Sequence, residues 1–461
     1  MANVVGTMAE QQLGFLSCVS IALGGMIGGG IFAVLGVVAQ LTGPATWAAF
    51  VLAGGVSGCA AYSFNALNRI VDDNGGSVTF VQTFTSNSTL AGMTGWTLLV
   101  GYVGSMAMYA FAFGSFAVGL SVVPETVAGM GVRPIVSVLA IAGFVGLNLL
   151  GAQATGSTEN LLVGLKVGIL LVMGLGGLYY GATHEGLSSG VGRLTQLSLN
   201  PIMAAAVSFV AFQGWQLLYY DQESIENATE TIRKAVYVAI PSAAALYVIV
   251  AITTLSLAPD DVIESHPERA LAVAADPFLP AGFLLISLAA LFSTGSAINA
   301  TLFSSGYLAK GMLSADLLPD RVGDSSASGV PRRTILLLGG ITAAFSVVGS
   351  LGAITSFASV AFIVVFGGMC AIAFDQRDMD AVDPTLPAVG VVTSALFFVL
   401  MFFHLYRSEP GTLVTVVVIS AAVIAVELLY FEREVLEEEI VEIEELIEDA
   451  VPGVAESAES E

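Results

Sequence analysis

The chain has 461 residues, of which 56% are apolar and 11% are charged. This composition excludes an ordinary water-soluble globular protein and is typical of a membrane protein that crosses the bilayer many times. No nucleic-acid partner is expected for a chain whose formal net charge is −23.

The acidic residues are spread over loops on both sides of the predicted membrane, and the chain has three lysines. Such a charge balance keeps a protein solvated in concentrated salt, so we expect the source to be a halophilic archaeon or a similar organism. A cationic partner is the alternative meaning of the charge. Cys18, Cys59 and Cys370 show no paired spacing, so neither a disulfide framework, a metal site nor a cofactor is predicted.

Twelve apolar stretches are long enough to cross a bilayer, which takes about 20 helical residues. These spans lie at roughly 13–41, 44–68, 90–121, 134–152, 158–180, 201–220, 235–258, 277–309, 333–350, 352–374, 387–405 and 411–431. The first six residues lack a basic segment, so no cleaved signal peptide is predicted. The fold class is therefore an all-α polytopic membrane protein with twelve transmembrane helices.

The positions of Lys and Arg indicate the orientation, because cytoplasmic loops carry an excess of both. Nine lie on one side if the N-terminus is cytoplasmic: Arg69, Arg233, Lys234, Lys310, Arg321, Arg332, Arg333, Arg377 and Arg433. Four lie on the other: Arg133, Arg193, Arg269 and Arg407. We therefore expect a plasma-membrane protein with both termini in the cytoplasm.

Span 1 contains five glycines between residues 21 and 33. Glycine costs about 1 kcal/mol relative to alanine inside a helix, so Gly28-Gly29-Gly30 is where this span is predicted to unwind. Broken backbone at membrane depth is tolerated where it is buried in protein or lines a cavity. A binding site is the usual reason for such a break.

Span 5 carries Lys166 about 12 Å inside its start, at the helical rise of 1.5 Å per residue. An ionisable group at that depth marks an ion or proton pathway by default. The alternative is that the long side chain reaches back to the cytoplasmic surface.

Span 6 also has a glycine in mid-course, Gly214, flanked by Gln213 and Trp215. Interrupted spans at corresponding positions of two halves indicate the binding site of inverted-repeat transporters. Spans 1 and 6 would then begin two five-helix repeats, although a single glycine is more often a packing position.

Residues 432–461 carry 13 acidic side chains with Arg433 as their one base, and they are interpreted as a solvated cytoplasmic tail, with a docking or pairing helix as the alternative.

Met26-Ile27-Gly28-Gly29-Gly30-Ile31-Phe32 resembles the Gly-x-Gly-Ile-Phe signature of the amino acid-polyamine-organocation superfamily. Four further stretches fit the family in order: 148–154 before Lys166, 209–215 followed by 221–223, 229–235, and 293–299 leading to 317–319. The resemblance covers roughly residues 13–375. It implies a leucine-transporter-like inverted repeat, with residues 13–180 and 201–374 as the two halves, 387–431 as two extra helices, and 1–12 as a cytoplasmic N-terminus.

The resemblance implies transport of amino acids by alternating access, with no enzymatic activity. The amides of Gly28, Gly29 and Gly30 would bind the substrate carboxylate, since helix N-termini are anion sites. Its ammonium would be bound by carbonyls around Gly25, Met26, Phe209 and Ala211, with Ile27 and Gly214 in the same substrate site. Phe212 and Trp215 would border the side-chain pocket. No acidic residue lies in spans 1 or 6, which favours neutral, apolar amino acids.

In some members of the superfamily, a lysine in span 5 replaces a sodium ion between spans 1 and 8. This likeness favours proton coupling through Lys166, near Ser293 and Thr294. Sodium coupling through Ser293 and Thr294 remains open, as do exchange and a homo-oligomeric state. The chain departs from the family at Gly306-Tyr307, where Arg is frequent, and at Trp215, where Phe is usual.

Two protein classes other than carriers, an enzyme and a channel, fit the sequence less well. Gly186-Leu-Ser-Ser-Gly190 has the pattern of a nucleophile elbow, but a loop between two spans lacks the strand and helix that the motif needs. A channel needs a selectivity filter or a charged ring, and Val100-Gly101-Tyr102 lies within a continuous span.

Overall fold

The structure is a computed structural model that describes residues 12–71, 76–120, 124–127, 129–150, 156–186, 200–220, 222–319, 321–324 and 330–426. Its α-helices are α1 Phe15–Thr42, α2 Thr46–Ile70, α3 Ser77–Thr85, α4 Ser88–Gly119, α5 Arg133–Leu149, α6 Gly156–Tyr180, α8 Asn200–Val207, α9 Ala228–Leu257, α10 Asp260–Ser265, α11 Ala270–Ala275, α12 Gly282–Ser314, α13 Arg332–Val348, α14 Leu351–Asp375, α15 Thr385–Ser408 and α16 Pro410–Val426.

Short elements connect these helices. They are the 3-10 helices η1 Gly43–Ala45, η3 Ser208–Phe212, η4 Trp215–Tyr220, η5 Gln222–Ser224 and η6 Pro267–Arg269, the π-helix η2 Gly181–Glu185, and the strands β1 Thr126–Val127 and β2 Met130–Gly131. The two strands form an antiparallel ribbon in which Thr126 pairs with Gly131.

Every predicted span overlaps a helical segment among the described residues, with ends that differ by up to seven residues, and residues 121, 151–152 and 427–431 of the predicted spans lie outside the described ranges. Seven helical stretches are long and apolar enough to cross a membrane, and the first of them, Phe15–Ile70, contains both α1 and α2. Shorter apolar helices lie at Arg133–Leu149, Asn200–Phe212 and Pro410–Val426. The chain is therefore a multi-pass membrane protein built from helices.

Local sequence explains where several helices begin and end. α1 ends at Thr42 and is capped by Gly43, whose φ of 54° suits glycine, and Pro44 follows. The side chain of Asn87 accepts a hydrogen bond from the Leu90 amide at the start of α4, and Ser350 caps α14 through the Ala353 amide. These caps satisfy amides that have no partner within the helix.

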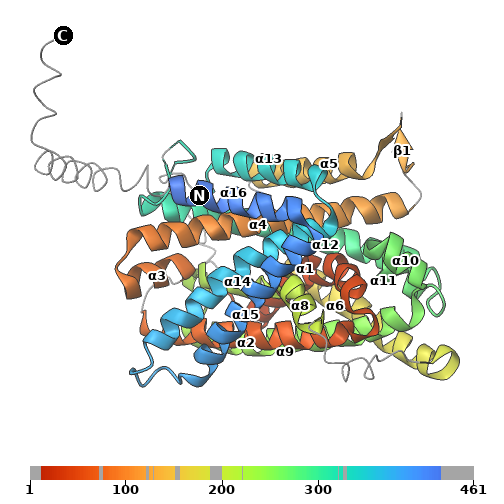
Figure 1. Cartoon of the computed structure of the whole chain (residues 1–461), viewed down its shortest axis with the longest axis horizontal. Helices are drawn as coiled ribbons and strands as arrows, with labels where there is room; N and C mark the ends of the chain where they lie inside the picture. The colour runs from red at the N-terminus through yellow and green to blue at the C-terminus, as the bar shows by residue number, and fades with distance from the viewer. Residues whose placement is uncertain are drawn as a thin grey trace, which may run out of the picture.

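Four of the five helices of the first predicted repeat pack against their counterparts in the second. α1 contacts the broken segment formed by α8, η3 and η4, α2 contacts α9, α4 contacts α12, and α5 contacts α13. α1 lies in the interior of the bundle, against α6, α9 and α12 (Figure 1). This packing places the centre of α1 beside segments that are far away in sequence.

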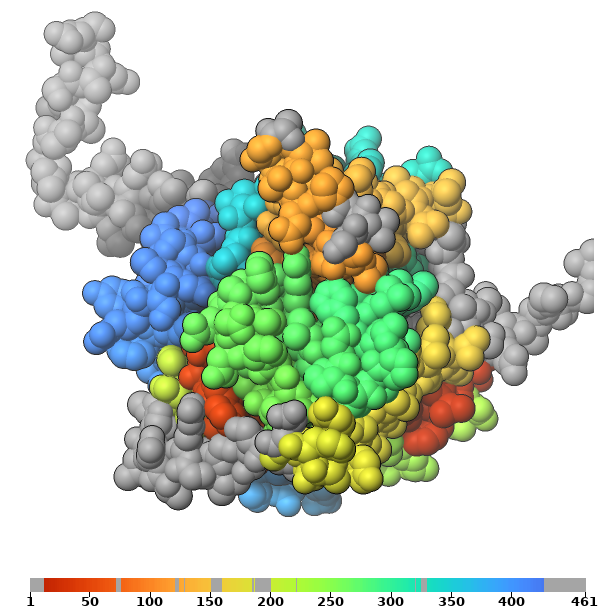
Figure 2. All heavy atoms as spheres, turned by 90° about the vertical axis from the view of Figure 1, so that its right-hand side faces the viewer, coloured from red at the N-terminus to blue at the C-terminus, as the bar shows by residue number. Residues whose placement is uncertain are grey.

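The segment from α10 to α11, residues 260–275, joins α9 to α12 and covers the end of the molecule at which α1 finishes. Figure 2 looks onto this face and shows the green residues of this region at its centre. Here it is called the cap. At the opposite end of α1, the Leu13 amide donates to the Ser224 carbonyl at 2.7 Å, which ties the chain just before α1 to η5.

Candidate functional site

The predicted break in span 1 is wrong for this structure, because α1 is a continuous helix from Phe15 to Thr42. The amides of Gly28, Gly29 and Gly30 therefore lie inside a helix, where each donates to a carbonyl four residues earlier. They do not form the exposed helix N-terminus that the sequence analysis assigned to a carboxylate.

The glycines of α1 act instead as positions of close packing. A methyl group added at Gly28 would lie 2.6 Å from the Cβ of Ala297, and one at Gly29 would lie 1.8 Å from Cδ1 of the Tyr109 ring. At Gly30 it would lie 2.9 Å from the Ala211 carbonyl oxygen. Glycine permits unwinding, but it equally permits such contacts, and here the neighbouring side chains occupy the space.

The predicted interruption of span 6 is confirmed. α8 ends at Val207, a 3-10 turn runs to Phe212, and the helix resumes as 3-10 structure at Trp215. Gly214 lies in the gap with φ of 126°, a conformation that side chains rarely adopt. The Gly214 amide donates to Oε1 of Gln216 at 2.6 Å, so a side chain satisfies the backbone at the break.

The break in span 6 touches α1 backbone to backbone. A methyl group on Gly25 would lie 2.8 Å from Cα of Gly214, and one on Gly214 would lie 2.6 Å from the carbonyl carbon of Gly25. The structure therefore brings together two glycines that the sequence analysis placed in one site.

Three side chains from three helices donate to carbonyls in the centre of α1. Nζ of Lys166 on α6 lies 3.2 Å from the Gly24 oxygen, and the Tyr247 hydroxyl on α9 lies 2.7 Å from the Met26 oxygen. Oγ of Ser293 on α12 lies 3.2 Å from the Ile27 oxygen. Lys166 is 5% exposed, so its ammonium group is held within the protein. Its side chain lies between α6 and α1.

Ser293 and Thr294 differ in what they contact. Ser293 reaches α1, whereas Oγ1 of Thr294 donates to the Ala290 carbonyl of its own helix at 2.6 Å. Both are buried. Of this predicted pair, Ser293 faces the site through a hydrogen bond to α1.

The structure also shows a polar network that the sequence analysis missed. Gln213 donates to the Tyr109 hydroxyl, and Nε2 of Gln216 donates to the Tyr102 hydroxyl at 3.2 Å. Tyr102 in turn donates to the Tyr220 hydroxyl at 3.3 Å. The two glutamines in the mostly apolar span 6 could have indicated this network, because buried polar groups require hydrogen-bond partners.

The aromatic residues of span 6 have different neighbours. The rings of Phe212 and Tyr247 are in edge contact, with centroids 5.3 Å apart. Phe209 and Trp215 both pack against Phe366 of α14. Nε1 of Trp215 also donates to Oγ of Ser57 on α2 at 3.0 Å. Phe212 thus lies beside the Tyr247 group that contacts α1.

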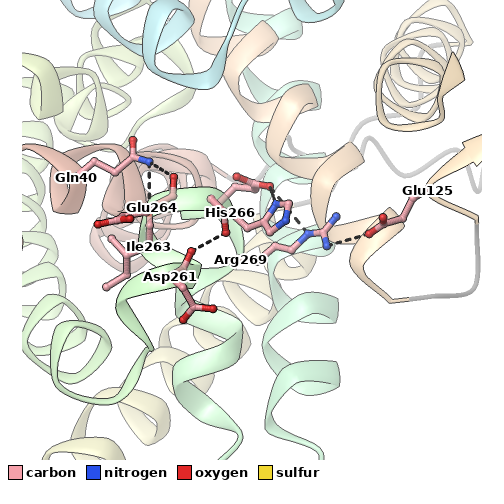
Figure 3. Close-up of polar contacts among 9 residues, drawn as sticks. Gln40, Glu125, Asp261, Ile263, Glu264, His266 and Arg269 are labelled. Carbon is pink, nitrogen blue, oxygen red and sulfur yellow. Dashed lines mark hydrogen bonds and ion pairs between the residues drawn. The ribbon is translucent and has the colours of Figure 1, made fainter.

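The cap is held on α1 by one side chain and by close packing. Nε2 of Gln40 donates to the carbonyls of Ile263 and Glu264 at 3.1 and 3.0 Å (Figure 3). A methyl group on Gly36 would lie 2.0 Å from the Pro267 oxygen. The cap therefore closes one end of the molecule over α1.

An ion-pair cluster connects the cap to the segment between α4 and α5. Nη1 of Arg269 lies 3.5 Å from Oε1 of Glu125, and its Nε lies 3.9 Å from Oε1 of Glu268 (Figure 3). Nδ1 of His266 lies 3.8 Å from the same Glu268 oxygen. Arg269 is therefore the charge that joins the two loops.

Within the described ranges, no three His, Cys, Asp or Glu side chains gather as metal ligands. Several stretches singled out from the sequence lie outside the described residues. They are most of the N-terminus 1–12, residues 151–154, Asp221, most of the Gly-x-Ser-x-Gly stretch, and the acidic tail 432–461.

Known proteins resemble the chain over most of its length. The model of a family described as amino acid permease matches residues 13–428. An uncharacterized protein of Methanocaldococcus jannaschii, MJ0609, is 29% identical over 78% of this chain and 81% of its own. The inner membrane transport protein YbaT of Escherichia coli is 27% identical over 90% and 96% of the two chains.

A mammalian relative is more distant. The b(0,+)-type amino acid transporter 1 of Mus musculus is 23% identical over 86% of this chain and 83% of its own. The archaeal relative does not establish a halophilic source. Because the family model covers most of the residues, including α1 and the broken span 6, the chain belongs to the amino acid permease family of the amino acid-polyamine-organocation superfamily.

Proposed function

We propose that this permease takes up neutral, apolar amino acids across the plasma membrane by alternating access, with both termini in the cytoplasm. The pairwise packing of α1 with the broken span 6, α2 with α9, α4 with α12, and α5 with α13 supports a leucine-transporter-like repeat of two five-helix halves. The central segments of α1 and span 6 contain no acidic residue, and a cationic substrate buried there would lack a counter-charge.

The observation that carries the coupling proposal is the position of Lys166. Its ammonium group is buried and donates to the Gly24 carbonyl, one helical turn before Gly28. A charge buried against the helix that lines the site is expensive to retain without a function. Loss of its proton would remove the positive charge and weaken the hydrogen bond between α6 and α1, so proton transfer and helix movement would be linked at this contact.

Sodium coupling is the second candidate, and Ser293 is the observation that favours it. Its hydroxyl, which belongs to α12, already donates to the Ile27 carbonyl of α1. A sodium ion would require additional oxygen ligands close to Ser293 and Thr294. Exchange of one amino acid for another is a further possibility within the same class of carrier.

The test is uptake of a radiolabelled amino acid panel into proteoliposomes under an imposed pH gradient or an imposed sodium gradient. One-to-one proton symport permits accumulation of about tenfold per pH unit, because one unit corresponds to about 1.4 kcal/mol. Lys166→Ala should abolish accumulation driven by the pH gradient while downhill exchange persists. Lys234→Ala is the matched control, since Lys234 is an exposed lysine paired with Glu230.

Normal accumulation by Lys166→Ala under a pH gradient would contradict the coupling role of Lys166. Accumulation that follows only the sodium gradient would favour the second candidate. A current that flows without any amino acid would favour a channel. Absence of saturable uptake for every amino acid would contradict the transport function as a whole.

A further inference from the structure

Two backbone carbonyls from different spans converge on one hydroxyl at the centre of the molecule. The Tyr247 hydroxyl lies 2.7 Å from the Met26 oxygen of α1 and 3.0 Å from the Ala211 oxygen of η3. Tyr247 is fully buried, and its ring is in edge contact with Phe50 and Phe212. These contacts hold the ring, and with it the hydroxyl group, in position.

The break in span 6 explains why the Ala211 carbonyl needs a donor. In a 3-10 helix, its partner would be the amide three residues later, at Gly214. That amide donates instead to Gln216 at 2.6 Å. A carbonyl without a donor is costly at membrane depth, and Tyr247 supplies the hydrogen bond.

One hydroxyl proton is shared between two oxygens, of which the Met26 oxygen also accepts from the Gly30 amide within α1. A tyrosine has a single O–H proton, whereas its two acceptors here both lie within hydrogen-bond distance. An ammonium group has three N–H donors and could serve both carbonyls at once. The absence of a side chain at Gly30 allows the hydroxyl and the two carbonyls to come together. A methyl group at this position would lie 2.8 Å from the hydroxyl and 2.9 Å from the Ala211 oxygen.

We propose that Tyr247 is a positioning residue whose hydroxyl occupies the ammonium site of the empty transporter and is displaced when an amino acid binds. This inference rests on the proposed function and adds a residue to it. Tyr247 supplies the donor that the Ala211 carbonyl lacks and holds that carbonyl beside the Met26 carbonyl between transport cycles. The substrate feature that it selects is the ammonium group, because a carboxylate alone cannot donate to these oxygens.

The proposal predicts that Tyr247→Phe binds L-leucine more tightly than the wild type does. The variant retains the ring contacts but leaves both carbonyls without the hydroxyl in the empty state, so an arriving ammonium group gains more than it does in the wild type. L-leucine should bind about two- to tenfold more tightly, the range expected for one hydrogen bond. Binding of 4-methylpentanoate, which is leucine without its amino group, should be unchanged.

The measurement is the Kd of each compound for purified wild type and variant. Tyr219→Phe is the matched control, because Tyr219 is also fully buried but donates to the side chain of Asn65 at 2.8 Å. The control should leave the ratio of the two Kd values unchanged. Equal or weaker leucine binding by Tyr247→Phe would overturn the proposal.

A structure of wild-type protein with bound L-leucine tests the same proposal if the variant fails to fold. The expected result is an ammonium group against the Met26 and Ala211 oxygens, with the Tyr247 hydroxyl moved away from at least one of them. A hydroxyl that still contacts both oxygens while leucine binds elsewhere would refute the inference. Wild-type uptake of leucine in proteoliposomes separates this result from failure of the proposed function.

Discussion

Gly25 and Gly214 bring α1 and the broken span 6 into direct backbone contact. Gly214 has a φ of 126°, and an added methyl group would lie 2.6 Å from the carbonyl carbon of Gly25. Both the backbone conformation and the available space therefore require glycine at position 214. The hydrogen bonds of Tyr247 to Met26 and Ala211 depend on this approach.

Gly214→Ala should destabilise the protein by on the order of 2–5 kcal/mol, through a strained backbone and overpacking. The measurement is the midpoint temperature for loss of the monodisperse peak of detergent-solubilised protein. Gly368→Ala is the control, because Gly368 lies within α14 and an added methyl group there meets no atom within 4 Å. Equal midpoints for the two variants would show that the contact between Gly25 and Gly214 is not restrictive.

Among the helices and loops, α1 and the cap form a unit that closes one end of the molecule. The short helix α10 ends at Ser265, and the carbonyls of Ile263 and Glu264 lie in its last turn. Gln40 near the end of α1 donates to both. This side chain satisfies carbonyls that a helix end leaves without partners, and it holds the cap against α1.

Gln40→Ala should loosen the cap without unfolding the bundle. Loss of these bonds costs about 1 kcal/mol each, or less where water replaces them. Amide hydrogen exchange of residues 260–269, followed by mass spectrometry in nanodiscs, should become several-fold faster. Gln376→Ala, a change at a half-buried position directly after α14, should leave that exchange rate unchanged. An unaltered rate in Gln40→Ala would mean that packing of Gly36 against Pro267 suffices to hold the cap.

For the whole molecule, the dominant property is the formal net charge of −23 on a chain with 14 basic residues. Like charges repel one another and oppose the compact state, and salt screens that repulsion. The Debye length falls from about 10 Å at 0.1 M salt to about 3 Å at 1 M. The isolated protein should therefore be more stable in concentrated salt.

We expect the midpoint temperature of the detergent-solubilised protein to rise steadily as KCl is raised from about 0.1 M to about 1 M, over which screening becomes short-ranged. The same series in NaCl separates screening from binding of a particular cation. Parallel curves indicate screening of the net charge. A flat response in both salts would contradict adaptation to a salt-rich environment.

The sequence by itself determined the helical membrane class, the approximate positions of the long apolar helices, the break at Gly214 and the presence of a lysine within span 5. These features depend on local properties: runs of apolar residues, and polar or glycine positions within them. The resemblance in α1 and span 6 also pointed to the family that the comparison over residues 13–428 then established.

The tertiary structure alone decided that α1 is continuous and that Tyr247 belongs to the central site. Glycine permits both an unwound segment and a closely packed helix, so the outcome depends on the residues that meet Gly28, Gly29 and Gly30. The donors on the α1 carbonyls lie 142 to 266 residues away in sequence. Helical periodicity in one stretch cannot reveal such partners, because it describes one helix and not the packing of others against it.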